Sequence, residues 1–283
     1  MGTSSSYGGP SGRTPLLPPW AEDPLDGVPP GEPVQPPPGD AGQGEPVPTP
    51  VAPEVTWRAP KRALSRLARG AGGGAPSGGL RALGRSYVRA AGGPRTATTA
   101  ARAGRATTAR LGGFLAAGIR DGFRPTVERL GLQGLLGQDV QIVLAAFVDL
   151  LAPDGALLEA AAARTALIDT LQAVFERYDV GADGVEALDR MDAVALGEVV
   201  ELSVVNYVNA RMQQELANRI ERGTLPEAEA NRLMIEIRDF IGEIVKLDFA
   251  GVDLVQLDWD GPAGRRLVAG VYEEAYRLLG EAE

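Results

Sequence analysis

The sequence has no cysteine and no histidine, and Lys61 and Lys246 are the only lysines among its 28 basic residues. The first two absences exclude disulfides, thiolate nucleophiles, imidazole bases and the Cys/His ligand sets of zinc, haem and iron–sulfur sites. Any catalysis would depend on carboxylates, arginine or hydroxyl groups. The sequence also lacks a P-loop, a GxGxxG motif after a strand and a GxSxG elbow. We therefore expect a protein that is not an enzyme and that binds no cofactor and no metal.

Long apolar runs are also missing. No uninterrupted apolar stretch reaches the about 18 residues that a membrane helix requires, so no membrane span is expected. The first residues have neither the basic nor the apolar region of a secretory signal, so we expect a cytoplasmic protein.

The formal net charge of −9 is distributed unevenly along the chain. Residues 1–60 have a net charge of −5, residues 61–130 of +12 and residues 131–283 of −16. Because changes in composition are typical of domain boundaries, four segments are predicted. They are an N-terminal recognition motif (1–20), a disordered Pro-rich linker (21–60), a flexible tether rich in Arg, Gly and Ala (61–110) and an all-helical domain (111–283).

The first 60 residues contain 16 of the 22 prolines. Proline removes backbone hydrogen-bond donors and disfavours helix at the preceding residue. The stretch from residue 28 to 60 has too little apolar surface to offset the entropy of ordering, which predicts disorder with polyproline II character. A stiff linker is favoured over a ligand for a proline-binding groove.

The predicted tether contains two short basic patterns that could form helices. Leu64 and Leu67 lie on one side of the first, and Leu80, Leu83 and Tyr87 on one side of the second, with glycines interrupting any longer helix. Clustered arginine neutralises phosphate, so the tether is a candidate polyanion-binding arm; the alternative is a solvated tether that lies against the acidic third segment. The candidate contacts are Arg62, Arg66, Arg69, Arg81, Arg85 and Arg89.

From about residue 111 the apolar residues recur at helical spacing, which predicts an all-α bundle of about six helices. The helix over 138–151 is the most apolar, and its stripe from Ile142 to Leu151 predicts that protein nearly surrounds it. Asp192 is a candidate N-cap of the long helix over 191–222, and Pro262 opens the last helix, over 262–279. The other predicted helices cover residues 114–121, 125–130, 156–178 and 224–246.

Three polar patterns in the third segment need interpretation. The stretch from Asp179 to Arg190 resembles a calcium loop, but Gly181 and Arg190 occupy ligand positions, so a helix-linking turn is the better interpretation. Asp258 and Asp260 are likewise interpreted as turn residues that cap the last helix rather than as metal ligands. Asn206 and Asn209 lie inside an apolar helical pattern. They either form interhelical hydrogen bonds of the kind that set register in coiled coils, or face solvent.

The extreme N-terminus, MGTSSSYGGPSGRTPLLPPW, combines small residues with the apolar side chains of Leu16, Leu17 and Trp20 in a Pro-rich context. An apolar cluster in such a segment indicates docking on a partner. Removal of the initiator Met would expose Gly2. The string also fits a myristoylation pattern, but the Arg-rich, Ala-rich composition is typical of bacteria, which generally lack that modification.

This opening, followed by a Pro-rich stretch, an Arg/Gly segment and a helical region, resembles the QatB family of the bacterial Qat antiphage defence system. The resemblance implies an ATPase, a QueC-like enzyme and a TatD-like nuclease as partners. It also implies that the QueC-like enzyme recognises or modifies Gly2, with Thr3, Ser4 and Ser5 as its recognition context, while the helical domain mediates assembly. The alternative function is a nucleic-acid-associated accessory protein that contacts phosphate through its Arg-rich segment.

Overall fold

The computed structural model describes residues 57–70, 77–152, 158–220 and 227–282, all of which belong to the unit that runs from Ala52 to Glu283. These residues are predominantly helical and contain no strand, which confirms the all-α fold class. The predicted number of about six helices was too low, because α4 to α11 and two 3-10 helices occupy the region where six were expected. The predicted N-terminal motif and all but the last four residues of the predicted Pro-rich linker lie outside the described residues.

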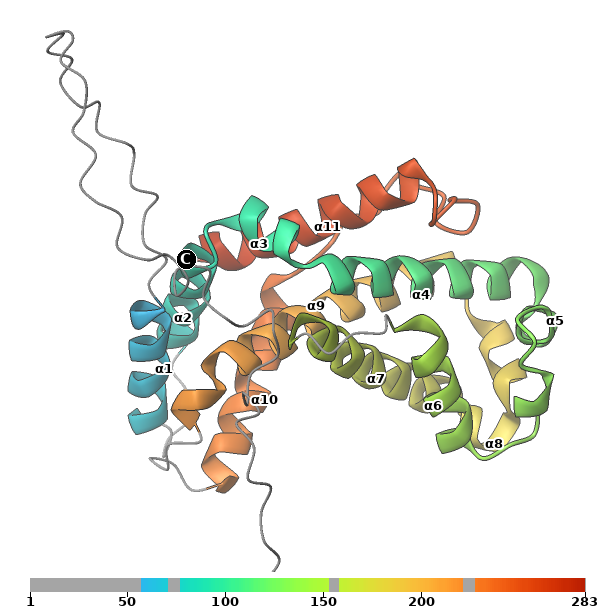
Figure 1. Cartoon of the computed structure of the whole chain (residues 1–283), viewed down its shortest axis with the longest axis horizontal. Coiled ribbons are helices and arrows are strands. Elements are labelled where there is room, and N and C mark those ends of the chain that lie inside the picture. The colour runs from blue at the N-terminus through green and yellow to red at the C-terminus, as the bar shows by residue number, and fades with distance from the viewer. Residues whose placement is uncertain (1–56, 71–76, 153–157, 221–226, 283) are drawn as a thin grey trace, which may run out of the picture. The chain divides into compact units, whose positions relative to one another are not determined.

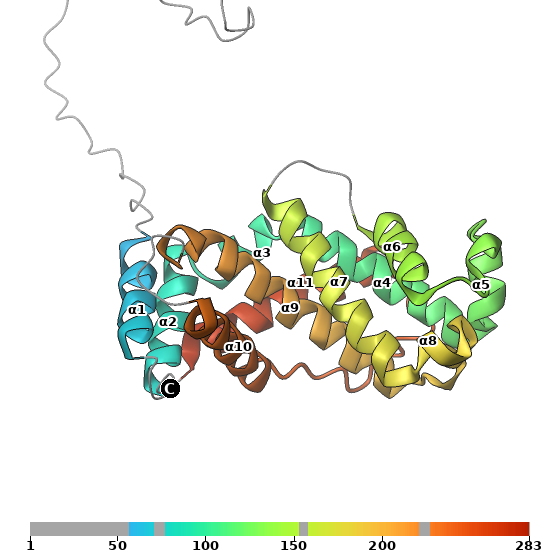
Figure 2. The same cartoon turned by 90° about the horizontal axis from the view of Figure 1, so that it is seen from below.

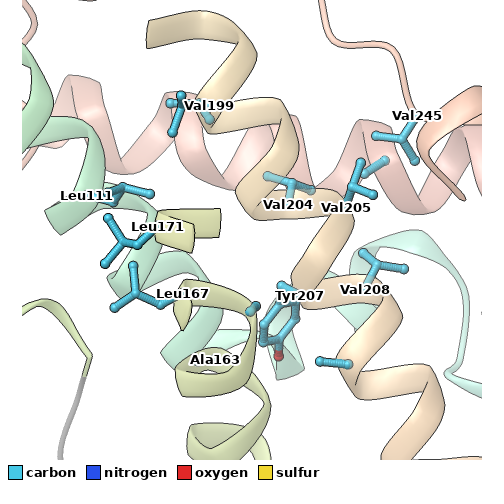
Figure 3. Close-up of a cluster of buried hydrophobic side chains, with 14 of the residues drawn as sticks. Leu111, Ala163, Leu167, Leu171, Val199, Val204, Val205, Tyr207, Val208 and Val245 are labelled. Atoms are coloured by element: carbon cyan, nitrogen blue, oxygen red, sulfur yellow. The ribbon is translucent and has the colours of Figure 1, made fainter. Parts of the chain in front are cut away.

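Three helices form the centre of the domain: α4 (Arg102–Asp121), α7 (Leu158–Tyr178) and α9 (Ala193–Ile220). Each packs against the other two. Figure 3 shows Leu111 of α4 and Leu167 of α7 on one side of α9, with Val245 on the other. The side chains of all three are buried. Asp192 accepts a hydrogen bond from the Ala195 backbone N–H at 2.8 Å, as predicted for the residue that caps α9.

Shorter helices follow α4 (Figures 1 and 2): α5 (Phe123–Arg129), the 3-10 helix η3 (Gln133–Leu135) and α6 (Val140–Leu151). A chain of ring contacts runs from Phe123 through Phe114 and Phe147 to Phe175, with centroids 4.9–6.0 Å apart. The expectation that protein nearly surrounds α6 was wrong. Its Ile142 is 50% exposed and its Leu150 37% exposed, because α6 packs on α7 and α4 with one face only.

The stretch from Asp179 to Arg190 forms α8 (Val180–Asp183) and the 3-10 helix η4 (Val185–Arg190). Asp179 adopts a left-handed conformation with φ of 57°, and Gly184 also has a positive φ, of 74°. This arrangement agrees with the predicted helix-linking turn.

The predicted flexible tether is part of the folded domain. It forms α1 (Arg58–Gly70), α2 (Ser77–Ala90), α3 (Pro94–Ala100) and the first half of α4. The two short basic helices are therefore confirmed. The interpretation as a tether and the boundary at residue 111 were wrong, because the apolar side chains of α1 and α2 are buried in the common core. These side chains are Leu64, Leu67, Leu80, Leu83 and Tyr87.

The last helices are α10 (Glu227–Ile244) and α11 (Pro262–Glu281), joined by an irregular segment over residues 245–261. Figure 1 shows α11 alongside α3 and α4, in agreement with the contacts between these helices. In the irregular segment, Asp248, Asp253 and Asp258 each accept a hydrogen bond from a backbone N–H two or three residues later. Trp259 is buried against Gly112 of α4, where a Cβ atom would lie 2.4 Å from the indole ring.

Helix α9 holds the two asparagines, and both are buried. Asn206 donates a hydrogen bond to Thr170 of α7 at 2.9 Å, which is an interhelical contact, whereas Asn209 accepts one from Gln213 within α9. Among the described helices, α9 is also the one whose length and apolar composition would suit a membrane span, although 72% of the apolar window is buried inside the domain. Such burial is typical of the central helix of a bundle.

Candidate functional site

The sequence directs attention to the basic helices α1 and α2, which pack against each other and against neighbouring helices. Trp57, just before α1, contacts the Tyr87 ring at a centroid distance of 5.7 Å. Helix α2 also approaches α11 closely, because Gly84 leaves space for the Leu279 side chain. The two helices are thus held by apolar packing, and their polar faces remain toward solvent.

The predicted polyanion contacts lie on these two helices. Arg62, Arg66, Arg85 and Arg89 are exposed, and Arg81 is half-buried; Arg69 belongs to α1, but its side chain lies outside what the structure describes. Arg85 donates a hydrogen bond to the Ala282 carbonyl at 2.7 Å and so ties α2 to the end of α11. Residues 57–110 include 12 basic and no acidic residues, so both helices are strongly cationic.

A partly buried polar layer lies beneath α2. The buried Tyr87 side chain lies near the Glu215 carboxylate of α9, and burial raises the pKa of this tyrosine. Glu215 also pairs with Arg211 one helical turn earlier. The pKa of the Glu215 carboxyl is raised because its burial outweighs the opposing effect of Arg211. This layer connects the cationic helices to the central helix of the domain.

A second polar contact fixes the start of α4. Both carboxylate oxygens of Glu159 in α7 accept hydrogen bonds from the Ala103 N–H, at 2.8 and 2.9 Å, and one accepts a further bond from the Gly104 N–H at 3.1 Å. The buried Tyr207 hydroxyl donates to the same carboxylate at 2.7 Å. Because Ala101, the N-cap of α4, offers no capping side chain, Glu159 satisfies this helix end from another helix.

The acidic patterns do not form a metal centre. Within the described ranges, no group of three or more acidic side chains is placed to hold a metal ion. Asp258 accepts a hydrogen bond from the Gly261 backbone N–H at 3.0 Å, and Gly261 precedes α11. This arrangement agrees with the interpretation of Asp258 as a turn residue.

Residues 92–279 match a family model described as Qat anti-phage system associated protein QatB. The chain belongs to the QatB family. As a QatB-family protein it is a component of the Qat anti-phage defence system, and other proteins of that system are its expected partners. Comparison with curated proteins finds no match, and comparison with solved structures finds none.

The region that matches QatB begins at the turn between α2 and α3, so every predicted site residue precedes it. The six arginines lie on α1 and α2, and these two helices pack against helices of the region that matches the family. The predicted modification and recognition residues lie outside the described residues, and their roles stay predictions: Gly2, Thr3, Ser4, Ser5, Leu16, Leu17 and Trp20.

Proposed function

We propose that this QatB-family chain is a non-enzymatic assembly subunit of the Qat system. In this proposal the helical domain binds partner proteins, and a QueC-like partner recognises or modifies the exposed N-terminal tail. The family match over residues 92–279 carries the proposal, because it assigns the helical domain to a multi-protein defence system. The apolar cluster of Leu16, Leu17 and Trp20 in the N-terminal segment supports docking of the tail on a partner.

Mass spectrometry of the N-terminal peptide tests the role of the tail. We expect a mass increase on the peptide that begins at Gly2 when the full chain is co-expressed with the QueC-like partner. Replacement of Leu16, Leu17 and Trp20 by alanine should abolish the increase. A matched variant that replaces Pro36 and Pro37 by alanine should retain it. If the partner is active but leaves Gly2 unmodified and does not bind the N-terminal tail, this part of the proposal is overturned.

Co-purification tests the assembly role. We expect the tagged full chain to recover the ATPase, the QueC-like enzyme or the TatD-like nuclease from cells that express the whole system. Recovery should be independent of nuclease treatment, because protein surfaces and not nucleic acid carry the contact. Failure to recover any of these proteins under both low and moderate salt would contradict an assembly subunit.

The alternative proposal is a nucleic-acid-associated accessory protein. It is favoured by the exposed arginines on α1 and α2, in a stretch that carries no acidic residue. Replacing Arg62, Arg66 and Arg89 by alanine should weaken DNA binding and reduce its dependence on salt, by about one unit of slope for each phosphate that is no longer neutralised. Replacing the exposed Arg232, Arg265 and Arg266 by alanine provides the matched control. Equal DNA affinity of both variants would exclude α1 and α2 as the DNA-binding surface.

A further inference from the structure

Two adjoining clefts lie on either side of the irregular segment between α10 and α11, and together we call them the acidic groove. The first, of ≈ 550 Å³, lies between this segment and the start of α9. The second, also of ≈ 550 Å³, lies between the same segment and α11. Leu247, Asp248 and Val252 line both clefts, so the two clefts are neighbours on the surface.

Apolar side chains line the groove and remain accessible. Val194 at the start of α9 is 70% exposed and Val252 of the irregular segment is 39% exposed. Phe249 and Leu257 are half-buried in the two clefts. At Gly270 of α11, an added Cβ atom would meet no other atom within 4 Å, so this wall is open. Exposed apolar residues gathered in a groove are typical of a binding site for a partner's apolar side chains.

The charges around the groove have one predominant sign. Five carboxylates line it against a single guanidinium, that of Arg266; the five belong to Glu198, Glu201, Asp248, Asp253 and Glu274. Glu198, Glu201 and Glu274 have cationic partners in Arg177, Lys246 and Arg277.

Asp248 and Asp253 differ from the other carboxylates of the groove. Each uses one oxygen to accept backbone hydrogen bonds within its turn, at 2.8–3.2 Å, and has no ion pair with a described residue. Their negative charge is therefore available to a cation that enters from outside.

We infer that the acidic groove docks a cationic amphipathic helix of a partner protein, an inference that rests on the proposed assembly function. Such a helix presents apolar side chains three and four residues apart, which is suited to two neighbouring clefts. Its lysines and arginines would lie opposite Asp248 and Asp253. The excess of carboxylates that line the groove also favours the approach of a cationic partner.

A second copy of this chain fits the groove less well. In a two-fold symmetric contact the same surface meets itself, so the carboxylates of one groove would face those of the other. Like charges placed opposite each other across an interface oppose binding. Charge complementarity thus disfavours a two-fold symmetric dimer through this groove and favours a cationic partner.

Two variants test the groove while preserving the fold. Gly270→Trp places a large ring in the open wall, where no neighbouring atom obstructs the Cβ. Asp248→Asn with Asp253→Asn removes two charges but keeps the side-chain oxygens that accept the turn hydrogen bonds. The matched control is Glu176→Gln with Asp239→Asn, two exposed carboxylates that do not line the groove.

Binding is measured by fluorescence anisotropy with the full chain and a labelled helical peptide of leucine and lysine. We expect the wild-type and control proteins to bind it with the same affinity, and the Trp and double-Asn variants to bind about tenfold more weakly. A leucine–glutamate peptide of the same length should not bind. Equal affinity for the wild-type protein and both groove variants would overturn the inference.

Co-purification from cells with the whole defence system separates this inference from the proposed function. If the wild-type chain recovers no system protein, the assembly function itself fails. If wild-type and groove variants recover the same proteins equally, only the groove is refuted. Light scattering provides the remaining outcome: a wild-type dimer that Gly270→Trp converts to a monomer would identify a second copy as the occupant and overturn the cationic partner.

Discussion

Replacement of Glu159 by alanine should destabilise the domain strongly, although the residue lies outside the hydrophobic core. Its carboxylate accepts hydrogen bonds from the Ala103 and Gly104 N–H groups in the first turn of α4 and from the Tyr207 hydroxyl of α9. The side chain thus joins three central helices through one charged group. Because Tyr207 is only 1% exposed, removal of Glu159 takes the protein acceptor away from a buried hydroxyl.

The magnitude follows from the two kinds of contact. Loss of a capping side chain costs about 1 kcal/mol. A buried hydroxyl left without a partner costs about 1–3 kcal/mol. Together these give a loss of about 3 kcal/mol in the free energy of unfolding for Glu159→Ala. Glu159→Gln keeps one acceptor oxygen and should lose about half as much, while Tyr207→Phe removes the hydroxyl together with its need for a partner and should cost about 1 kcal/mol.

Urea denaturation of the full chain, followed by circular dichroism, measures these losses. The double variant Glu159→Ala/Tyr207→Phe should be more stable than the sum of the single losses predicts, by about 1 kcal/mol, because the orphaned hydroxyl is absent. A loss below about 0.5 kcal/mol for Glu159→Ala would refute a capping role for this carboxylate, and strict additivity in the double variant would refute its coupling to the Tyr207 hydroxyl.

Three further predictions concern single positions. Gly112→Ala should lower the free energy of unfolding by about 3 kcal/mol, because the new Cβ would lie 2.4 Å from the Trp259 ring; thermal melting checks this. Gly270→Ala should instead raise the free energy of unfolding by up to about 1 kcal/mol, because alanine favours helix and no atom obstructs its Cβ at this position. A melting midpoint below that of the wild-type protein would contradict this prediction. Burial raises the pKa of the Glu215 carboxyl, so the folded protein keeps this proton at pH values where the unfolded chain has lost it. Stability from this group is therefore present below the unfolded pKa and declines as pH rises through the folded one; Glu215→Gln should remove that decline in urea titrations at several pH values.

The sequence was sufficient to predict the all-α class and the later helices to within a few residues. The predicted helix over 262–279 corresponds to α11, and Asp192 caps α9 as expected. Apolar spacing and capping residues are local signals, so they can be recognised in the sequence without knowledge of the fold. The failure at α1 and α2 has the opposite cause. Their leucines were recognised, but the surface of α9 and α11 that buries them is remote in sequence, so glycine and arginine content suggested a tether.

The candidate surfaces were less accessible to sequence reasoning. Glu159 carries no motif, and its role arises only because α4 and α9 bring backbone N–H groups and Tyr207 to the same place. The acidic groove also joins residues from distant elements, such as Val194 and Gly270. A sequence signal does exist at Gly104, since an isolated glycine within a helical pattern indicates a close approach, here to the Tyr207 ring.

The segment between α10 and α11 should tolerate a change of length less well than most connections between helices, because aspartate hydrogen bonds hold its turns. Its turn-forming aspartates recur every five residues, at 248, 253 and 258, and the last is followed by the indole that lies on Gly112. Loops commonly accept inserted residues because few of their side chains are buried. Here one added residue would place an apolar side chain where an aspartate must accept its hydrogen bonds. A reporter or affinity tag is therefore unsuited to this connection, although it contains no helix.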